Sequence, residues 1–263
     1  MENKYSGLEP LLRIDNLSIN FGGLKAVDNV SLKVFPGQIV GLIGPNGAGK
    51  TTVFNLLTGV YQPSSGEIYI DGNKMPDKIQ PHEVVKLGLA RTFQNIRLFK
   101  QLTVLENVMV AFNQEMKTNI FQSALRTRKF YKEEEYYKNK ALEILSIFDL
   151  AVYASEQAQN LPYGKQRKLE IARAMATNPK VLLLDEPAAG MNPTETHELM
   201  EMIEYIRKNY QIAILLIEHD MSLVMNICEY ITVLEYGAPI AAGTPEEIAN
   251  NQRVIQAYLG SED

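Results

Sequence analysis

The segment Gly44-Pro-Asn-Gly-Ala-Gly-Lys-Thr51 constrains the fold of this chain more than any other feature of its sequence. It fits the pattern G-x-x-x-x-G-K-[ST] at every fixed position, and it lies between an apolar run and a stretch that predicts a helix from Lys50. Glycines in this pattern let backbone N–H groups converge on phosphate oxygens, and the helix N-terminus adds partial positive charge. We therefore predict a phosphate-binding loop in which Lys50 supplies charge for β- and γ-phosphates and Thr51 a hydroxyl for Mg²⁺.

Two carboxylates after the apolar run Val181–Leu184 form the second group of candidate residues. Ligands of open α/β sheets gather at the carboxyl ends of strands, where the phosphate-binding loop also lies. We expect Asp185 to hold Mg²⁺ through oxygen, and Glu186 to orient an attacking water or accept its proton. His219 follows another apolar run, Ile212–Ile217, so we expect it at the same edge, near the γ-phosphate or the water. A lone histidine is more often structural, but this position favours a functional role.

Alternation of strands and helices predicts an α/β fold with a mostly parallel central sheet. The helices expected between the later strands are Thr194–Lys208 and Met221–Cys228, and the stretch from about Leu102 to Met175 reads as a helical insertion. Its charged run Lys129–Lys140 is interpreted as a solvated helix face. The expected strands are Leu12–Asn20, Val30–Val34, Gln38–Ile43, Glu67–Asp71, Lys180–Asp185, Ile212–Ile217 and Ile231–Leu234.

Composition excludes several classes of function. The net charge of −5 argues against nucleic-acid binding, and the one cysteine, Cys228, allows no internal disulfide and fits a reducing compartment. The polar start MENKYSGLEP is not that of a signal peptide. The apolar runs are far shorter than the roughly 20 residues that span a bilayer. Any membrane role is therefore expected to come through a partner.

The order of these motifs resembles the ATP-binding cassette (ABC) family of transport ATPases over nearly the whole chain. The resemblance implies ATP and Mg²⁺ as cofactors and a P-loop NTPase fold with an N-terminal antiparallel β subdomain and an inserted α-helical subdomain. It implies a single domain over 11–263, with a nucleotide-binding core at 11–94 and 177–245, a helical subdomain at 95–176 and a C-terminal helical tail at 246–263. The residues then expected around the nucleotide are Phe21, Gly44, Pro45, Asn46, Gly47, Ala48, Gly49, Lys50, Thr51, Thr52 and Gln94.

The same resemblance implies roles that the residues alone do not suggest. Phe21 matches the aromatic residue that stacks on adenine. Gln94, in Arg91-Thr-Phe-Gln-Asn95, matches the glutamine that reaches Mg²⁺ and water from a loop that senses the membrane subunits. The implied catalytic residues are Glu186, His219, Gln94 and Lys50, and the implied metal ligands are Thr51, Gln94 and Asp185.

The stretch Leu161-Pro-Tyr-Gly-Lys165 falls where the family has its Leu-Ser-Gly-Gly-Gln signature. A glycine turn at a helix N-terminus presents free N–H groups to an anion, which in the family is the γ-phosphate held by a second cassette. Leucine and the second glycine are kept, whereas proline replaces the serine, and we hypothesise that Lys165 supplies compensating charge. The residues expected to act across such a dimer are Leu161, Tyr163, Gly164, Lys165 and Asn192, the last of which stands where many members have aspartate.

Several segments look like the ATP-binding subunits of bacterial branched-chain amino acid uptake systems. They are Arg91–Phe99, Tyr163-Gly164, Glu186–Pro193, Gly243–Ile248 and Ala257–Gly260. The implied partners are a second ATPase subunit, identical or related, two membrane permeases and a periplasmic or extracellular solute-binding protein. The implied location is the inner face of the cell membrane, reached through the permeases from the cytoplasm. Alternatives are a lipid or lipopolysaccharide exporter, a urea or amide importer and, less favoured, a soluble cassette ATPase.

Overall fold

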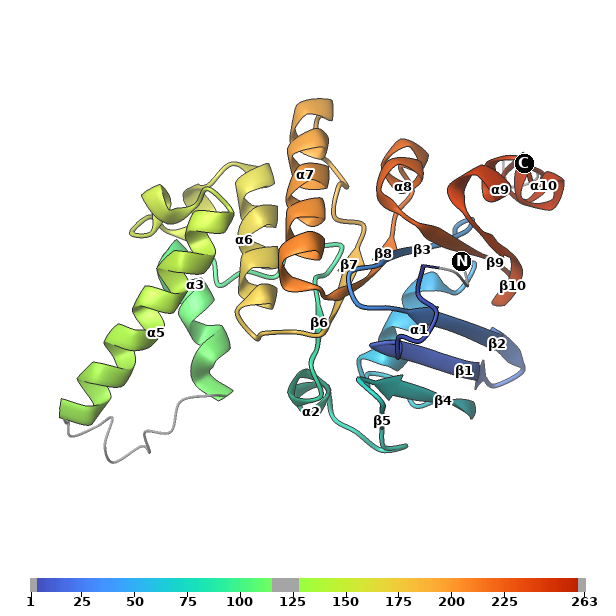
Figure 1. Cartoon of the computed structure of the whole chain (residues 1–263), viewed down its shortest axis with the longest axis horizontal. Helices are drawn as coiled ribbons and strands as arrows, with labels where there is room; N and C mark the ends of the chain where they lie inside the picture. Colours follow the sequence, from blue (N-terminus) through green and yellow to red (C-terminus); the bar gives the residue numbers. More distant parts are fainter. Residues whose placement is uncertain (1–3, 115–127, 260–263) are drawn as a thin grey trace. The chain divides into compact units, whose positions relative to one another are not determined.

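The computed structural model describes residues 4–114 and 128–259 of the chain. They fall into two compact units (Figure 1). The first unit comprises Met1–Gln94 and Pro179–Asp263, and the second comprises Asn95–Asn178. Each unit has its own secondary structure and is described separately below.

A six-stranded sheet forms the centre of the first unit, with strand order β10-β9-β3-β8-β7-β6. Neighbouring strands are parallel except β9 and β10, which form an antiparallel hairpin at one edge, so the predicted mostly parallel sheet is confirmed. Every residue of the three central strands β3, β7 and β8 is buried, as expected for strands covered on both faces. The strands are β3 (Ile39–Ile43), β6 (Leu89–Arg91), β7 (Val181–Asp185), β8 (Ala213–Ile217), β9 (Tyr230–Glu235) and β10 (Ala238–Gly243).

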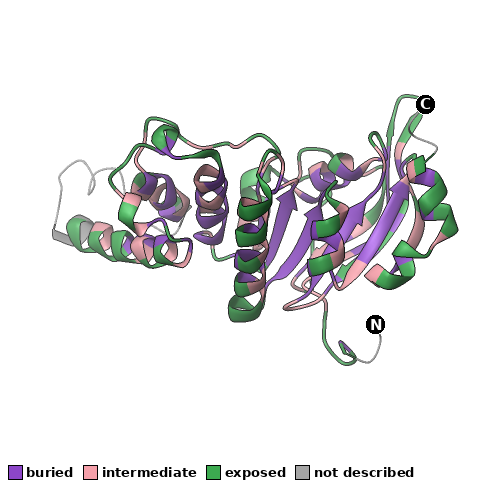
Figure 2. Cartoon of the chain, turned by 90° about the horizontal axis from the view of Figure 1, so that it is seen from above, coloured by how far each residue is buried: buried purple, intermediate pink, exposed green. Residues whose placement is uncertain are grey.

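Helices of the first unit present one apolar side to this sheet and a polar side to solvent. Figure 2 shows the strands in purple beside helices whose outer sides are green. In α7, for example, Leu199, Met202, Ile203 and Ile206 are buried at helical spacing. The helices are α1 (Lys50–Leu57), α2 (Pro81–Lys86), α7 (Pro193–Tyr210), α8 (Met221–Ile227), α9 (Pro245–Ala249) and α10 (Gln252–Leu259).

A second, antiparallel sheet in the same unit has strand order β2-β1-β4-β5. Its inward side chains belong to the same apolar core as α1 and the central strands, which is why the N-terminal strands alternate buried and exposed residues. The predicted strand Val30–Val34 is longer than expected, because β2 begins at Leu24. The strands are β1 (Leu12–Phe21), β2 (Leu24–Val34), β4 (Ser65–Ile70) and β5 (Asn73–Lys74).

The second unit is helical, as predicted for the middle of the chain. It contains α3 (Val104–Met109), α5 (Arg128–Ile147) and α6 (Tyr163–Met175), with short 3₁₀ turns at Val110–Gln114, Ala151–Tyr153 and Ala158–Asn160. Thr103 and Glu106 form a capping box that fixes the start of α3. Within the charged run, most described residues of α5 are exposed or half-buried, and Tyr137 is buried.

Two strands of the central sheet were not predicted. β6 has only three residues, and β10 (APIAAG) is made of small residues and a proline, so neither carries a strand pattern of its own. Both segments become strands because they pair with a neighbouring strand, β6 with β7 and β10 with β9. In the described part of the chain, no helix combines the length and the apolar character needed to cross a membrane.

Gly66 provides a test of how β4 meets β1. Its φ is +94°, and an added Cβ would lie 2.5 Å from the carbonyl oxygen of Asn16, in the neighbouring strand. Gly72 has a similar φ of +75° but has open space where its Cβ would be. We expect Gly72→Ala to cost about 1 kcal/mol of unfolding free energy, from backbone strain alone, and Gly66→Ala to cost about 2 kcal/mol more. Urea unfolding measures both, and equal losses would contradict the close approach of the two strands.

Candidate ATP-binding and catalytic site

The phosphate-binding loop lies between β3 and α1, and two of its glycines are required by close backbone contacts. A Cβ on Gly44 would lie 2.1 Å from the Leu234 carbonyl oxygen in β9, and one on Gly49 would lie 2.5 Å from the Ala26 carbonyl oxygen in β2. Gly47, with φ of +77°, has nothing within 4 Å of its Cβ position. The loop is therefore seated against two strands on one side and open on the other, where Asn46 and Gly47 are exposed.

The phosphate-binding loop combines a buried lysine with a helix N-terminus, and both are favourable for binding an anion. Lys50 is 6% exposed, and its Nζ donates to the carbonyl oxygens of Gly44 at 2.6 Å and Pro45 at 2.9 Å. Burial lowers the pKa of this ammonium group, and the nearby charges of Glu186 and Asp185 partly offset that effect. The N-terminus of α1 has no side-chain cap and no acidic residue in its first turn, so its free N–H groups remain for a ligand. Thr51, in that same turn, is exposed.

Two of the predicted catalytic side chains, Gln94 and His219, contact the carboxylate of a third, Glu186. Glu186 follows β7 in a left-handed turn with φ of +47°. Gln94 Nε2 donates to its Oε2 at 2.5 Å, and His219 Nε2 lies 2.8 Å from its Oε1. The Glu186 side chain is only 14% exposed, whereas that of His219 is 42% exposed. Both oxygens of the carboxylate are thus oriented at the edge of the sheet that carries the phosphate-binding loop.

The residues predicted to hold Mg²⁺ suit an ion that takes part of its ligands from nucleotide phosphates. Among the described residues, no group of three His, Cys, Asp or Glu side chains could hold a metal without help. Mg²⁺ usually takes one or two carboxylates and completes its shell with substrate phosphates and water. Asp185 at the end of β7 and Thr51 at the start of α1 match that donor set.

Two residues without a predicted role are integral to the site. Arg91 Nη2 donates to Asp185 Oδ2 at 2.6 Å. Glu218 Oε1 accepts the N–H of Ala188 at 2.7 Å, and its Oε2 accepts that of His219 at 3.0 Å. Burial raises the pKa of Glu218, although these backbone N–H groups favour its ionised form. Position gives the only sequence signal for either residue, since Arg91 comes three residues before Gln94 and Glu218 directly precedes His219.

Phe21 and Asn192 have local roles that the sequence did not suggest. Phe21 ends β1, is 44% exposed and packs edge-to-face against Tyr61, with ring centroids 5.1 Å apart. The Phe21 ring is therefore held by Tyr61 while remaining partly exposed. Asn192 is the N-cap of α7, where its side chain accepts the N–H of Glu195 at 3.0 Å.

The signature stretch lies in the second unit, at the N-terminus of α6. Pro162 is the N-cap and provides no side-chain hydrogen bond, and the first turn contains no acidic residue. Leu161 and Gly164 are buried, whereas Tyr163 is 43% exposed. The Lys165 ammonium lies 4.3 Å from the centroid of the Tyr153 ring, which holds it beside this turn. The turn thus presents uncapped N–H groups and a nearby cation, which is chemistry suited to an anion.

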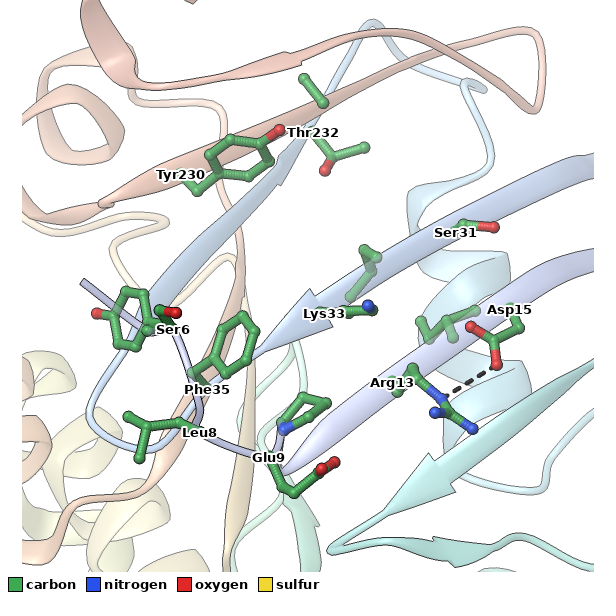
Figure 3. A pocket seen from close by; sticks show the side chains of 15 residues that line it. Ser6, Leu8, Glu9, Arg13, Asp15, Ser31, Lys33, Phe35, Tyr230 and Thr232 are labelled. Atoms are coloured by element: carbon green, nitrogen blue, oxygen red, sulfur yellow. Dashed lines mark ion pairs between the residues drawn. The ribbon is translucent and has the colours of Figure 1, made fainter. Parts of the chain in front are cut away.

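A separate pocket of about 780 Å³ lies elsewhere in the first unit (Figure 3). The N-terminal segment Tyr5–Pro10 and strands β1, β2, β9 and β10 line it. Its charges are mixed, with Arg13 paired to Asp15 at 3.1 Å and Lys33 beside them. None of the predicted site residues lines this pocket.

Comparison with known proteins agrees with the geometry. The sequence profile described as "ABC transporter" matches residues 27–189, and the profile "Branched-chain amino acid ATP-binding cassette transporter" matches residues 238–263. The high-affinity branched-chain amino acid transport ATP-binding protein LivG of Escherichia coli K12 is 50% identical, over 96% of this chain and 98% of that protein. The corresponding protein BraF of Pseudomonas aeruginosa is 48% identical, over 95% and 98%. The lipopolysaccharide export ATP-binding protein LptB of Haemophilus influenzae is 34% identical, over 96% and 98%.

Solved structures show the same fold. An ATP-binding cassette of an ABC transporter in its ADP conformation superposes with a TM-score of 0.82 at 32% identity, covering 96% of this chain and 99% of that one. A dimeric cassette in a post-hydrolysis state, bound to ADP and Pi, gives 0.73 at 25% identity, covering 89% and 98%. The predicted P-loop NTPase fold is confirmed. The chain therefore belongs to the ABC transporter family and is an ATPase of that family.

Proposed function

We propose that this ATPase energises the import of branched-chain amino acids. The observation that carries the proposal is 50% identity over 96% of the chain to a protein described as serving high-affinity branched-chain amino acid transport. The match of residues 238–263 to a branched-chain amino acid cassette profile supports it from a separate part of the chain. Identity to the lipopolysaccharide export protein is lower, at 34%, over the same share of this chain.

The hydrolytic step rests on the residues around Glu186. Bound Mg·ATP supplies the phosphoryl group, and the chain supplies position and charge. Lys50 and the N–H groups of α1 would neutralise phosphate oxygens, while Thr51 and Asp185 would hold the metal ion. Glu186 accepts a proton from the attacking water, with Gln94 and His219 fixing its two oxygens. Phe21 stacks on the base.

A complete site requires a second cassette. The uncapped turn at the start of α6 binds a γ-phosphate held by the phosphate-binding loop of that second cassette, identical or related. Leu161 anchors the turn from the core of its unit, Gly164 allows close approach and Lys165 adds charge. Asn192 acts across the same dimer from the N-cap of α7.

The remaining partners follow from the transport role. The cassette works with two membrane permeases, which it contacts near Gln94–Phe99, and with a periplasmic or extracellular solute-binding protein. It lies on the cytoplasmic face of the cell membrane through those permeases. The solute itself is bound by the partners and not by this subunit.

Substitution of Glu186 tests the chemistry. Glu186→Gln keeps the shape of the side chain but cannot accept a proton, so we expect ATP hydrolysis to fall by at least about 100-fold. ATP binding is retained, and an ATP-dependent dimer should accumulate on size-exclusion chromatography. Glu201→Gln, at an exposed position on α7, is the matched control. Normal hydrolysis by Glu186→Gln would exclude Glu186 as the base.

Glu218 is expected to affect turnover without touching nucleotide. In Glu218→Gln, an amide NH₂ would face a backbone N–H, which should cost about 1–3 kcal/mol of unfolding free energy. Because Glu218 holds the His219 backbone, kcat should fall roughly tenfold, or about 1.4 kcal/mol in the barrier, while KM for ATP changes little. Glu235→Gln, at the end of β9, is the control. A rise in KM with unchanged kcat would contradict a role through His219.

Uptake assays test the solute. Deletion of the gene in its own host should abolish high-affinity uptake of labelled leucine, isoleucine and valine. The wild-type chain should restore uptake, and Glu186→Gln should not. Loss of urea or amide uptake, with leucine uptake intact, would replace the proposed solute. Intact uptake of all these compounds, together with a defect in the lipopolysaccharide of the outer surface, would favour export.

A further inference from the structure

The metal-binding carboxylate already has a cation against it. Arg91 Nη2 lies 2.6 Å from Asp185 Oδ2, and the two side chains are only 6% and 5% exposed. The other oxygen of Asp185, Oδ1, has no hydrogen-bond partner in the part of the chain that the structure describes. The buried carboxylate is therefore neutralised on one side and open on the other.

Arg91 is fixed in this position from several directions. Its Nη1 donates to Asn55 Oδ1 in α1 at 2.8 Å, and it lies 3.4 Å from Oγ1 of Thr58, the C-cap of that helix. The guanidinium carbon lies 5.4 Å from the ring centroid of Phe54 and 5.0 Å from that of Phe93. A planar guanidinium that is bonded through both of its Nη atoms and lies near two aromatic rings has little freedom to leave.

Lys50, the other buried cation of the site, does not neutralise Asp185 through a hydrogen bond. Lys50 Nζ hydrogen-bonds to carbonyl oxygens of its own loop, and none of its hydrogen bonds goes to Asp185. A buried carboxylate without a counter-charge is strongly unfavourable. Arg91 is thus the group that satisfies Asp185 before any metal ion arrives.

The residues that follow Arg91 also contact β7 and the glutamate after it. Thr92 N–H donates to the Leu183 carbonyl at 3.0 Å, and Gln94 reaches Glu186. Arg91 and Gln94, three residues apart in the chain, therefore contact the two acidic residues at the end of β7, Asp185 and Glu186.

We infer that Arg91 is a built-in counter-ion of Asp185 that suppresses binding of a divalent metal ion when no nucleotide is present. A metal ion at Asp185 would share the carboxylate with a fixed positive charge, so phosphate oxygens are needed to make binding favourable. Metal binding is thereby made conditional on the nucleotide. The inference rests on the proposed role of Asp185 as a metal ligand, and it makes Arg91 a positioning residue, because it acts through Asp185.

Mn²⁺ alone, without nucleotide, is the probe. The purified full chain is titrated with MnCl₂, and free Mn²⁺ is followed by electron paramagnetic resonance. Arg91→Gln keeps a polar side chain of related shape but removes the charge, and it should tighten Mn²⁺ binding by at least about tenfold over the wild type. Arg91→Lys keeps the charge and should remain near the wild type. Adding Asp185→Asn to Arg91→Gln should abolish the gain.

Thermal unfolding gives a second readout and guards against misfolding. Arg91→Gln should have a lower Tm than the wild type in metal-free buffer, and MnCl₂ should raise that Tm but not the wild type's. Arg207→Met, which removes a partly buried arginine paired with Glu204 and Glu229, should lose Tm without recovering it in MnCl₂.

The outcomes separate the inference from the proposed function. If Arg91→Gln binds Mn²⁺ no more tightly than the wild type, or if Arg91→Lys gains as much as Arg91→Gln, the counter-ion inference is wrong. If the single variant Asp185→Asn binds Mg·ATP with unchanged metal dependence, the metal role of Asp185 fails, and with it the basis of the inference.

Discussion

The functional site depends on the register of the parallel strands at the centre of the sheet. Asp185, the last residue of β7, pairs with Ile217, the last residue of β8, and β3 lies on the other side of β8. All three strands are buried on both faces, so a slip of one residue would move every side chain to the opposite face, among different neighbours, and disrupt close packing on both sides. The strand register consequently brings together the polar residues that follow these strands. This is why residues almost 170 positions apart in the chain, such as Lys50 and His219, belong to one site.

Features that depend on local sequence could be predicted, whereas features that depend on contacts between distant parts of the chain could not. The strands β3, β7 and β8 carry continuous apolar runs, and the phosphate-binding loop carries a motif, so both are local signals. The three residues of β6 and the small residues of β10 carry none, because they become strands only by pairing with β7 and β9. Arg91 and Glu218 were missed for the same reason. Their partners, Asp185 and Ala188, are far away in the chain, and an arginine or a glutamate in sequence looks like a surface residue.

Similarity to a family and local geometry answer different questions about the same residues. The resemblance assigned Asn192 to contact across a dimer, and the structure shows it capping α7 within its own chain. The two are compatible, since a cap fixes the position of the side chain before a partner arrives. Likewise, Pro162 removes the hydroxyl donor that the family pattern has, but it leaves the N–H groups of α6 uncapped. The departures from the pattern therefore alter the side chains at this turn more than the uncapped backbone N–H groups at the start of α6.

The two buried cations of the site, Lys50 and Arg91, have different partners. Lys50 rests on neutral carbonyl oxygens, which phosphate oxygens can replace with a gain in charge pairing. Arg91 rests on a carboxylate, and a metal ion held as proposed would share Asp185 with it. Lys50 can therefore exchange its carbonyl partners for phosphate oxygens, whereas Arg91 is expected to keep its ion pair with Asp185. Because burial disfavours any uncompensated charge here, phosphates and metal ion are each more favourable together than apart. If Asp185 holds the metal ion as proposed, the order in which nucleotide and metal ion bind is set by where the chain places its own charges, before any second cassette or permease is involved.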